Sequence, residues 1–419
     1  MGFELEYVTR FADRQELLFR NYAGAAGSDL RPIETELYRL CRSHDIGSCG
    51  DRRSRVLRSV ATRGRVDYHP SVSDLRNRID EGTTYRPPPE TGRAGLGAAM
   101  EHDVLELVAL RDAVAREEGF GSYAELAMSS EGLDIDAVRE FSVKTRDETI
   151  EACRGIVQLE QLSLEFWFDG LERIGGVDVP DLLNAVTELT TRLGLGGIAE
   201  RISWIVRSQP IYGAAFAISV PDDVRVLLGR TESLVAVATA YHELGHALAH
   251  AANMSDGIFK TWEVTTDETI AVVIERVAAA VALTDDNRRK LELIELLEAA
   301  RLATSLSFEF EVADNPHDVR ELFGRWYTPL VPVSDPAIWA LDTFRSIDPF
   351  HIQGYLIGNV VAEATITYLT DRYPNNPEAW GQWLFTNYLA AGRSVSLSER
   401  LNSLEEYRPT SLDPLLVPQ

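Results

Sequence analysis

Helical periodicity extends along most of this 419-residue chain and constrains its fold more than any other feature. Apolar residues recur at helical spacing in the first 60 residues, as in Glu34–Leu40 and Arg55–Val60, and again from about residue 98 onward. Residues 66–97 contain clustered Pro and Gly, including Tyr85–Pro89, and predict an irregular connection. The later segments predicted as helices are 100–117, 123–128, 135–173, 181–195, 232–252, 266–283, 287–307 and 351–372.

One segment departs from this periodicity. Phe216–Val220 and Val224–Leu228 are short apolar runs on either side of Pro221-Asp222-Asp223, which predicts a strand, a turn and a strand within residues 211–229. A strand edge beside a binding site can pair with an extended peptide backbone. A hairpin that only covers the following helix is an equally good interpretation.

Composition and charge exclude several classes of protein. A chain with 45% hydrophobic and 25% charged residues is typical of a folded globular protein. No apolar run approaches the roughly 18–20 residues that span a bilayer, and the start of the chain has no signal-peptide pattern, so we expect no membrane partner and a cytoplasmic location. The net charge of −24 argues against nonspecific binding of nucleic acid. Cys41, Cys49 and Cys153 are too few for a disulfide framework, and Cys41, His44 and Cys49 match no zinc-finger spacing.

The stretch His242-Glu243-Leu244-Gly245-His246 carries the strongest chemical signal. Positions four apart lie on one face of a helix about 6 Å apart, so His242 and His246 can bind one zinc ion. Glu243 is rotated by about 100° from His242, which suits a general base that acts on a water rather than a ligand. His250 continues the spacing but lies about 12 Å from His242 along the axis, too far for a third ligand.

A third protein ligand is expected from the next predicted helix. Glu268 and Glu275 are seven residues apart, so both lie on one otherwise apolar face. Two histidines, one glutamate and an open position form a known catalytic zinc set. We therefore predict Glu268 as the ligand, with Asp267 and Glu263 as alternatives, and Glu275 as a carboxylate that orients a ligating histidine. The competing interpretation of Glu268 is a capping box with Thr265.

The stretch Tyr241–Leu248 resembles the metal-site helix of the thimet oligopeptidase and oligoendopeptidase F family of zinc peptidases. Angiotensin-converting enzyme and the thermostable carboxypeptidases are more distant relatives of that family. Glu268 and Glu275 match its spacing of a ligating glutamate and a second glutamate seven residues later. Three further stretches are similar to segments of the family: Leu110–Tyr123, Gly213–Phe216 and Asp348–Gly358.

The resemblance implies a mainly α, zincin-like fold with two helical lobes flanking a substrate cleft and a small hairpin or sheet beside the metal-site helix. It implies an N-terminal helical region, residues 1–95, that is shorter than in the family, and a catalytic domain, residues 96–419. It also implies one Zn²⁺ per chain, a short peptide as the partner, and Tyr355, helped by His351, as the donor to the oxyanion. The family often carries tyrosine where this chain has His351, and its histidine seven after the first ligand is replaced by Ala249.

The expected function is therefore that of a zinc-dependent oligopeptidase. The alternatives are a dedicated processing peptidase that removes a leader from one peptide, and a peptide-binding relative with weak catalysis. The sequence leaves the substrate preference and the oligomeric state open.

Overall fold

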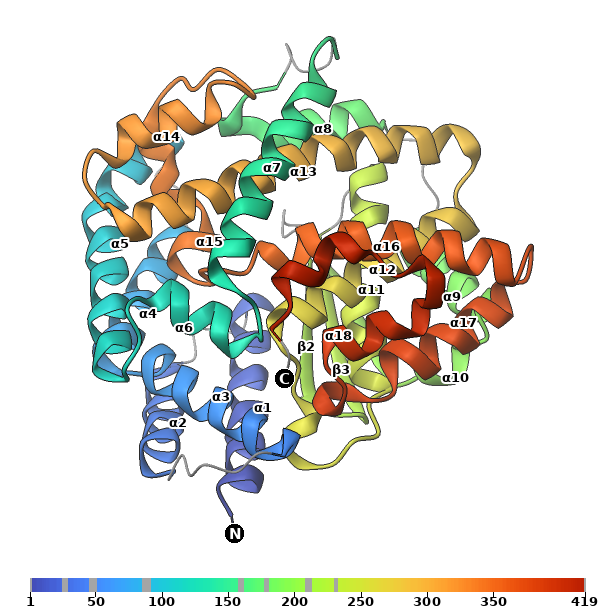
Figure 1. Ribbon diagram of the computed structural model, residues 1–419, viewed down its shortest axis with the longest axis horizontal. Coiled ribbons are helices and arrows are strands. Elements are labelled where there is room, and N and C mark those ends of the chain that lie inside the picture. Colours follow the sequence, from blue (N-terminus) through green and yellow to red (C-terminus); the bar gives the residue numbers. More distant parts are fainter. Residues whose placement is uncertain are drawn as a thin grey trace.

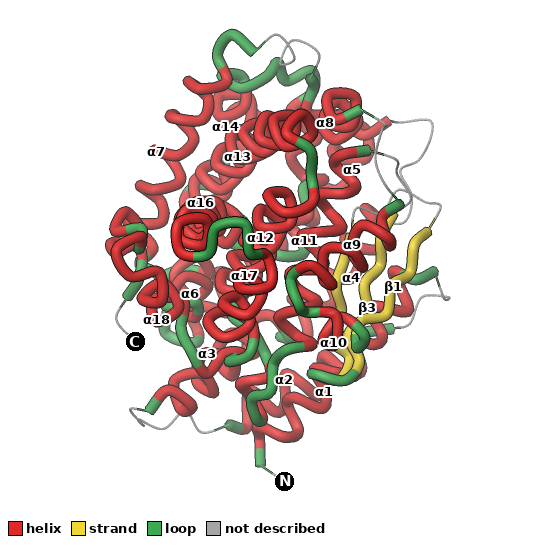
Figure 2. The backbone as a smooth tube through the Cα atoms, turned by 90° about the vertical axis from the view of Figure 1, so that its right-hand side faces the viewer, coloured by secondary structure: helices red, strands yellow, loops and turns green. Residues whose placement is uncertain are grey.

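The computed structural model describes residues 2–24, 29–44, 51–84, 92–156, 162–176, 181–207, 213–229 and 233–417. In these residues helices dominate and one small sheet is present, which confirms the predicted mainly α architecture (Figures 1 and 2). The first helices are α1 (Phe3–Tyr22), α2 (Arg31–Ser43), α3 (Arg52–Asp67), α4 (Pro70–Thr84), α5 (Gly92–Glu117), α6 (Tyr123–Ser130), α7 (Ile135–Cys153), α8 (Trp167–Gly175), α9 (Leu182–Arg192) and α10 (Gly196–Ala199).

The second half of the chain begins with the sheet and continues as helices. Its strands are β1 (Ile202–Arg207), β2 (Gly213–Ser219) and β3 (Asp223–Gly229). Its α-helices are α11 (Leu234–Ala251), α12 (Val264–Ala282), α13 (Asp285–Asp314), α14 (Val319–Tyr327), α15 (Thr343–Ser346), α16 (Gln353–Arg372), α17 (Pro377–Leu384) and α18 (Leu397–Leu401). Short 3₁₀ turns lie at Leu164–Phe166, Gly257–Lys260, Pro336–Leu341, Gly392–Ser394, Asn402–Tyr407 and Thr410–Leu415, and a π turn at Phe385–Leu389.

Two of the expected segments were wrong. Residues 70–84 form α4 rather than an irregular connection, because Pro70 occupies the first turn, where its missing N–H is not needed, and Val72, Leu75 and Ile79 are buried on one face. Tyr85–Pro89 lies outside the described residues. The single helix expected over 135–173 ends at Cys153, close to Gly155, whose φ of +84° is incompatible with continuing a right-handed helix.

The sheet has three strands in the order β1-β3-β2. The expected hairpin is present: β2 and β3 pair antiparallel, with Ala215 opposite Val226. Strand β1 was not predicted; it pairs parallel with β3 from Ile202 to Arg207. Because β3 is central, β2 is an edge strand, and α11 packs against both β2 and β3.

The helices form two lobes (Figure 1). Helices α11, α12 and α16 pack closely on one another beside the sheet, whereas α13 packs on α7 and α8 in the other lobe. A cleft of about 830 Å³ lies between the two groups. One wall contains residues of α8, α13, α14 and α15, and the other contains residues of α11, α12, α16 and Gly213 at the start of β2.

Three further expectations concern the chain as a whole. The division at residue 95 falls within α5 and stays a prediction. Cys41 and Cys153 are buried free thiols, whereas Cys49 lies outside the described residues. Within the described part of the chain, no helix combines the length and apolar character needed to cross a bilayer.

Candidate metal centre

Helix α11 presents His242 and His246 on one face at the floor of the cleft. The helix begins at a Ser233 cap, whose side chain accepts a hydrogen bond from the Ala236 N–H. Its apolar faces are buried against the sheet and α12. The two histidine side chains are about nine-tenths buried, at 12% and 11% exposed, so their ring nitrogens need partners inside the protein.

Helix α12 supplies Glu268, and glycines allow it to approach closely enough. A Cβ atom at Gly245 of α11 would lie 2.6 Å from the Cα atom of Ala271, so only glycine permits this helix contact. On the other side of α12, a Cβ atom at Gly354 of α16 would lie 2.6 Å from the Cβ atom of Glu268. Glu268 is therefore held between two helices that touch its own backbone, with a side chain that is 6% exposed.

Three donor atoms converge at one point. The Nε2 atoms of His242 and His246 lie 3.2 Å apart. Glu268 Oε2 lies 3.2 Å from His242 Nε2, and Glu268 Oε1 lies 3.5 Å from His246 Nε2. In tetrahedral zinc sites with bonds of about 2.0–2.1 Å, neighbouring donor atoms are about 3.3 Å apart. The triangle therefore has the dimensions of three ligands around one ion. Glu268 Oε2 is also buried without a hydrogen-bond partner in the described structure, as expected of a ligand atom.

Two further carboxylates approach the Nδ1 atoms of the histidine pair. Glu275 Oε2 lies 3.2 Å from His242 Nδ1, at the position expected for an orienting carboxylate. Asp267 Oδ1 lies 3.3 Å from His246 Nδ1, and the other oxygen of Asp267 lies 3.7 Å from His250 Nε2. Asp267, an alternative ligand in the sequence prediction, thus lies behind a histidine instead of in the donor triangle. Such contacts fix the ring orientation of ligating histidines.

The start of α16 adds His351 and Tyr355 to the same centre. His351 Nε2 lies 2.6 Å from Glu268 Oε1. The Tyr355 ring stacks on the His242 ring, with centroids 5.4 Å apart and planes within 10° of parallel. Tyr355 lines the cleft, whereas His351 contacts the predicted ligand Glu268. The two residues therefore occupy different places, which the sequence did not distinguish.

Glu243 lies on the cleft side of α11, next to the end of the edge strand. A Cβ atom at Gly213 would lie 2.7 Å from Cγ of Glu243 and 2.8 Å from Thr239. Glycine at this position leaves room for the carboxylate of Glu243 to face the cleft, which both residues line. The side chain is not in the donor triangle, in agreement with a role other than ligation.

Burial and charge shift the titration of these groups in opposite directions. Burial lowers the pKa of His242, but its contacts with Glu268 and Glu275 outweigh burial and raise the pKa to about 9. Burial raises the pKa of Glu268, but the charges of His246 and His351 hold it well below the usual value. Burial raises the pKa of the Glu243 carboxyl. The centre thus carries concentrated negative charge that favours a bound cation.

The remaining alternatives from the sequence are resolved by contacts. Helix α12 begins at Val264, so Thr265 lies inside the helix and Glu268 forms no capping box with it. Glu263 is bound to Arg393 at 3.1 Å, away from the histidines. His250 is outside the donor triangle, as its distance along α11 predicted.

A mainly helical, zincin-like fold with two lobes, and a two-histidine, one-glutamate centre at the floor of the cleft, define the class of scaffold. The same fold occurs in the M32 carboxypeptidase from Deinococcus radiodurans R1, at a TM-score of 0.68 and 14% identity over 98% of this chain and 95% of that one. Trypanosoma cruzi metallocarboxypeptidase 1 shares it at a TM-score of 0.62 and 12% identity over 98% of both chains. An oligoendopeptidase F assigned to Bacillus anthracis str. Ames shares it at a TM-score of 0.58 and 13% identity, over 98% of this chain and 82% of that one.

These likenesses confirm the predicted fold. No family model matches the sequence, and no curated protein matches it significantly. The structural relatives are nearly the same length as this chain or moderately longer, so the likeness extends over both lobes.

Proposed function

We propose that this protein is a zinc-dependent endopeptidase that hydrolyses peptide bonds in short peptides. The observation that carries the proposal is the donor triangle of His242, His246 and Glu268 at the floor of a cleft that Glu243 also lines. Two imidazoles and one carboxylate form an established ligand set for catalytic zinc, and the distances between these atoms fit one ion per chain.

The residues around the centre have distinct tasks in this proposal. A zinc ion held by the triangle supplies Lewis-acid chemistry, which polarises a carbonyl and makes a water more acidic. The Glu243 carboxylate accepts the proton of the attacking water and then donates it to the leaving amine nitrogen. Burial raises the pKa of Glu243, which makes its carboxylate a stronger base. The Tyr355 hydroxyl donates a hydrogen bond to the developing oxyanion. Burial raises the pKa of this hydroxyl well above its usual value, so it keeps its proton.

The cleft and the edge strand suit an extended peptide. A volume of about 830 Å³ accommodates a few residues, and side chains from both lobes line it. Strand β2 has one free edge within the described sheet and begins at Gly213, beside Glu243. An extended backbone that pairs with this edge would pass directly over the general base.

The charges in the cleft favour cleavage within a chain. A carboxypeptidase needs a cation for the terminal carboxylate of its substrate. Three of the four arginines that line the cleft are already paired: Arg276 with Glu295, Arg301 with Glu298 at 2.9 Å, and Arg345 with Asp342 at 3.0 Å.

A carboxypeptidase is nevertheless the second candidate, because the fold is shared over nearly the full length with carboxypeptidases. Arg93, the fourth arginine of the cleft, has no carboxylate partner among the described residues and is exposed. It is the group that would bind a terminal carboxylate in that case. The dedicated processing peptidase expected as an alternative differs only in the range of its substrates. The cytoplasmic location stays a prediction.

The decisive experiment combines metal analysis with mass spectrometry of products from a peptide pool supplied with free and with amidated C-termini. An endopeptidase with bound zinc yields internal fragments from both forms. Release of single C-terminal residues that amidation abolishes, and that Arg93→Gln weakens, would replace the proposal with a carboxypeptidase. Cleavage of a single sequence would identify a dedicated processing enzyme. A chain that binds no zinc and cuts no peptide would refute the proposal.

A further inference from the structure

Glu309 is a buried carboxyl group that the proposed mechanism does not use. It lies on α13, in the lobe opposite α11 and α12, and is 5% exposed. One of its oxygens, Oε1, accepts a hydrogen bond of 2.8 Å from the backbone N–H of Phe350. The other, Oε2, is buried without a hydrogen-bond partner in the described structure. A buried carboxyl is costly to keep, so a protein that retains one at this position requires a reason.

The backbone that Glu309 holds is in an unfavourable conformation. Phe350 has a φ of +53°, in the left-handed region that residues other than glycine rarely adopt. Such conformations persist where the surroundings hold them, and they cluster at functional sites. Three groups hold this one: the Phe350 ring packs on the Phe310 ring at 5.2 Å, its N–H is bound by Glu309, and its carbonyl oxygen accepts a 2.6 Å hydrogen bond from Gln353.

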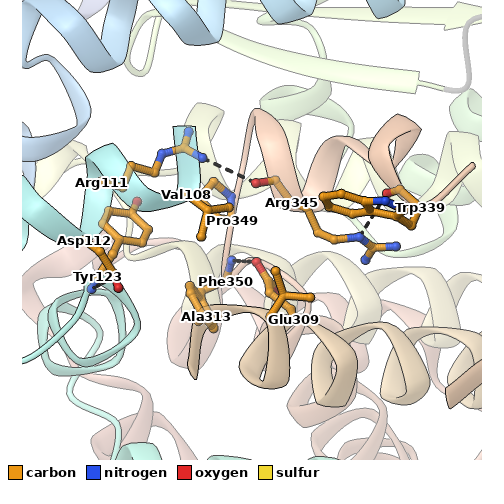
Figure 3. A pocket seen from close by; sticks show the side chains of 11 residues that line it. Val108, Arg111, Asp112, Tyr123, Glu309, Ala313, Trp339, Arg345, Pro349 and Phe350 are labelled. Carbon is orange, nitrogen blue, oxygen red and sulfur yellow. Dashed lines mark hydrogen bonds between the residues drawn. The ribbon is translucent and has the colours of Figure 1, made fainter. Parts of the chain in front are cut away.

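The segment before Phe350 is held from the same side. Arg111 of α5 donates to the carbonyl oxygens of Arg345 at 3.4 Å and Ile347 at 3.3 Å. Figure 3 shows the Glu309 side chain reaching the Phe350 backbone from α13, and Arg111 reaching the same segment from α5. A cavity of only about 30 Å³ separates these groups, so the segment has little room to shift.

The residue that follows Phe350 is His351, whose Nε2 atom lies 2.6 Å from Glu268 Oε1. The direction of the His351 side chain depends on the backbone at Phe350, because a change of φ there rotates the chain that follows. Gln353, which binds the Phe350 carbonyl, also approaches Thr265 at 3.3 Å, so the segment is tied to α12 as well. The contacts form a continuous path from Glu309 through Phe350 and His351 to Glu268.

We propose that Glu309 is a positioning residue: by holding the Phe350 N–H it keeps His351 against Glu268 and thereby orients this ligand in the metal centre. The inference rests on the proposed function for its effect on catalysis. It links α13, in one lobe, to the metal centre built by α11 and α12 in the other. Positioning contacts of this kind around ligands typically change metal affinity or activity by about 10–100-fold.

The test compares substitutions at Glu309 that keep or remove the acceptor atom. Glu309→Gln retains an oxygen of the same reach, whereas Glu309→Leu removes it. Thr304→Val is the matched control, because Thr304 is equally buried on α13 and its hydroxyl donates to the Ala300 carbonyl of its own helix. If Glu309→Leu does not fold, Glu309→Asp provides the same comparison, because its carboxylate is withdrawn by one methylene.

Zinc affinity by chelator competition and kcat against KM are measured for each variant. We expect Glu309→Leu to weaken zinc binding and lower kcat about tenfold or more, with KM changed less than about threefold, while Glu309→Gln and Thr304→Val stay within about threefold of the wild type. In a His351→Ala background, Glu309→Leu should add less than about twofold, because its effect passes through His351. Equal values for Glu309→Leu and Thr304→Val, or effects that multiply in the His351→Ala background, would overturn the proposal.

Hydrogen exchange at the Phe350 amide provides a readout that does not depend on activity. The amide should be protected in the wild type and in Glu309→Gln, and exchange at least about tenfold faster in Glu309→Leu. Unchanged protection in Glu309→Leu would contradict the tether even if the protein is a peptidase. A wild type without zinc or peptidase activity but with the expected exchange pattern would instead refute only the proposed function.

Discussion

Asp267 Oδ1 lies 3.3 Å from His246 Nδ1, on the side of the ring opposite the donor triangle. Glu275 holds the corresponding place at His242, at 3.2 Å. Each histidine of the pair therefore has its own carboxylate, and both carboxylates come from α12, the helix that also carries Glu268. One helix thus supplies a ligand and the orientation of two others.

We predict that Asp267→Asn and Glu275→Gln each weaken zinc binding by about 10–100-fold, because the ring nitrogens lose the charge that fixes their orientation. Competition with a chelator of known affinity measures the change. Asp285→Asn, at the exposed start of α13, is the control and should leave the affinity unchanged. Wild-type affinity in both variants would show that the carboxylates are not needed for orientation.

Glu243→Gln should keep zinc and lose most turnover. The amide has nearly the same shape as the carboxylate but cannot accept the proton of the attacking water, so kcat should fall by about 10²–10⁴-fold. Metal analysis and steady-state kinetics on one preparation check both parts. Retained activity would remove Glu243 from the role of general base.

Tyr355→Phe should lower kcat by about 10²-fold or more with little change in KM, because the phenol hydroxyl acts on charge that develops in the transition state. The ring remains, so its stacking on His242 at 5.4 Å is preserved and zinc affinity should not change. A rise in KM alone would indicate that Tyr355 binds the substrate and does not stabilise the oxyanion.

Gly354→Ala should destabilise the protein by about 1–3 kcal/mol and weaken zinc binding, because the added Cβ atom would meet Cβ of Glu268 at 2.6 Å. Gly324→Ala in α14 is the matched control, since no atom lies within 4 Å of the added methyl group. That variant should gain about 0.5–1 kcal/mol from helix propensity. Chemical denaturation with and without zinc distinguishes the two. Equal behaviour of the variants would show that α16 can move away from α12.

Glu309→Gln should stabilise the protein in a pH-dependent way. Burial raises the pKa of Glu309 to about 8, with Arg345 and Arg111 opposing the rise and Asp342 adding to it. A raised pKa in the folded state means that the stability of the wild type is fully present below about pH 4.5 and is lost as pH rises to about 8. The amide does not titrate, so the advantage of Glu309→Gln should grow over this interval, to about 2–5 kcal/mol at pH 8. Denaturation curves from pH 5 to 8.5 measure it, and a constant difference would contradict the raised pKa.

Local patterns predicted the helices of the metal centre well. The expected segments 232–252, 266–283 and 351–372 correspond to α11, α12 and α16 with ends within two residues. These helices have strong apolar periodicity, which is a local property. Strand β1 was missed because its pairing with β3 is parallel and separated by the length of β2, and no turn signal marks such a pair. Glu309 was missed because nothing in its neighbourhood along the chain points to Phe350, 41 residues later.

The pairing of His242 with His246 was determined by the sequence alone, because the spacing of four residues in a helix places two side chains together whatever surrounds them. The choice between Glu268 and Asp267 was decided only by the tertiary structure. Neighbouring residues on a helix point about 100° apart, so the rotation of α12 against α11 selects which carboxylate enters the donor triangle and which lies behind the histidine. That rotation depends on the close contacts at Gly245 and Gly354, which join segments far apart in the chain. The same holds for His351, whose contact with Glu268 exists only because α16 packs on α12.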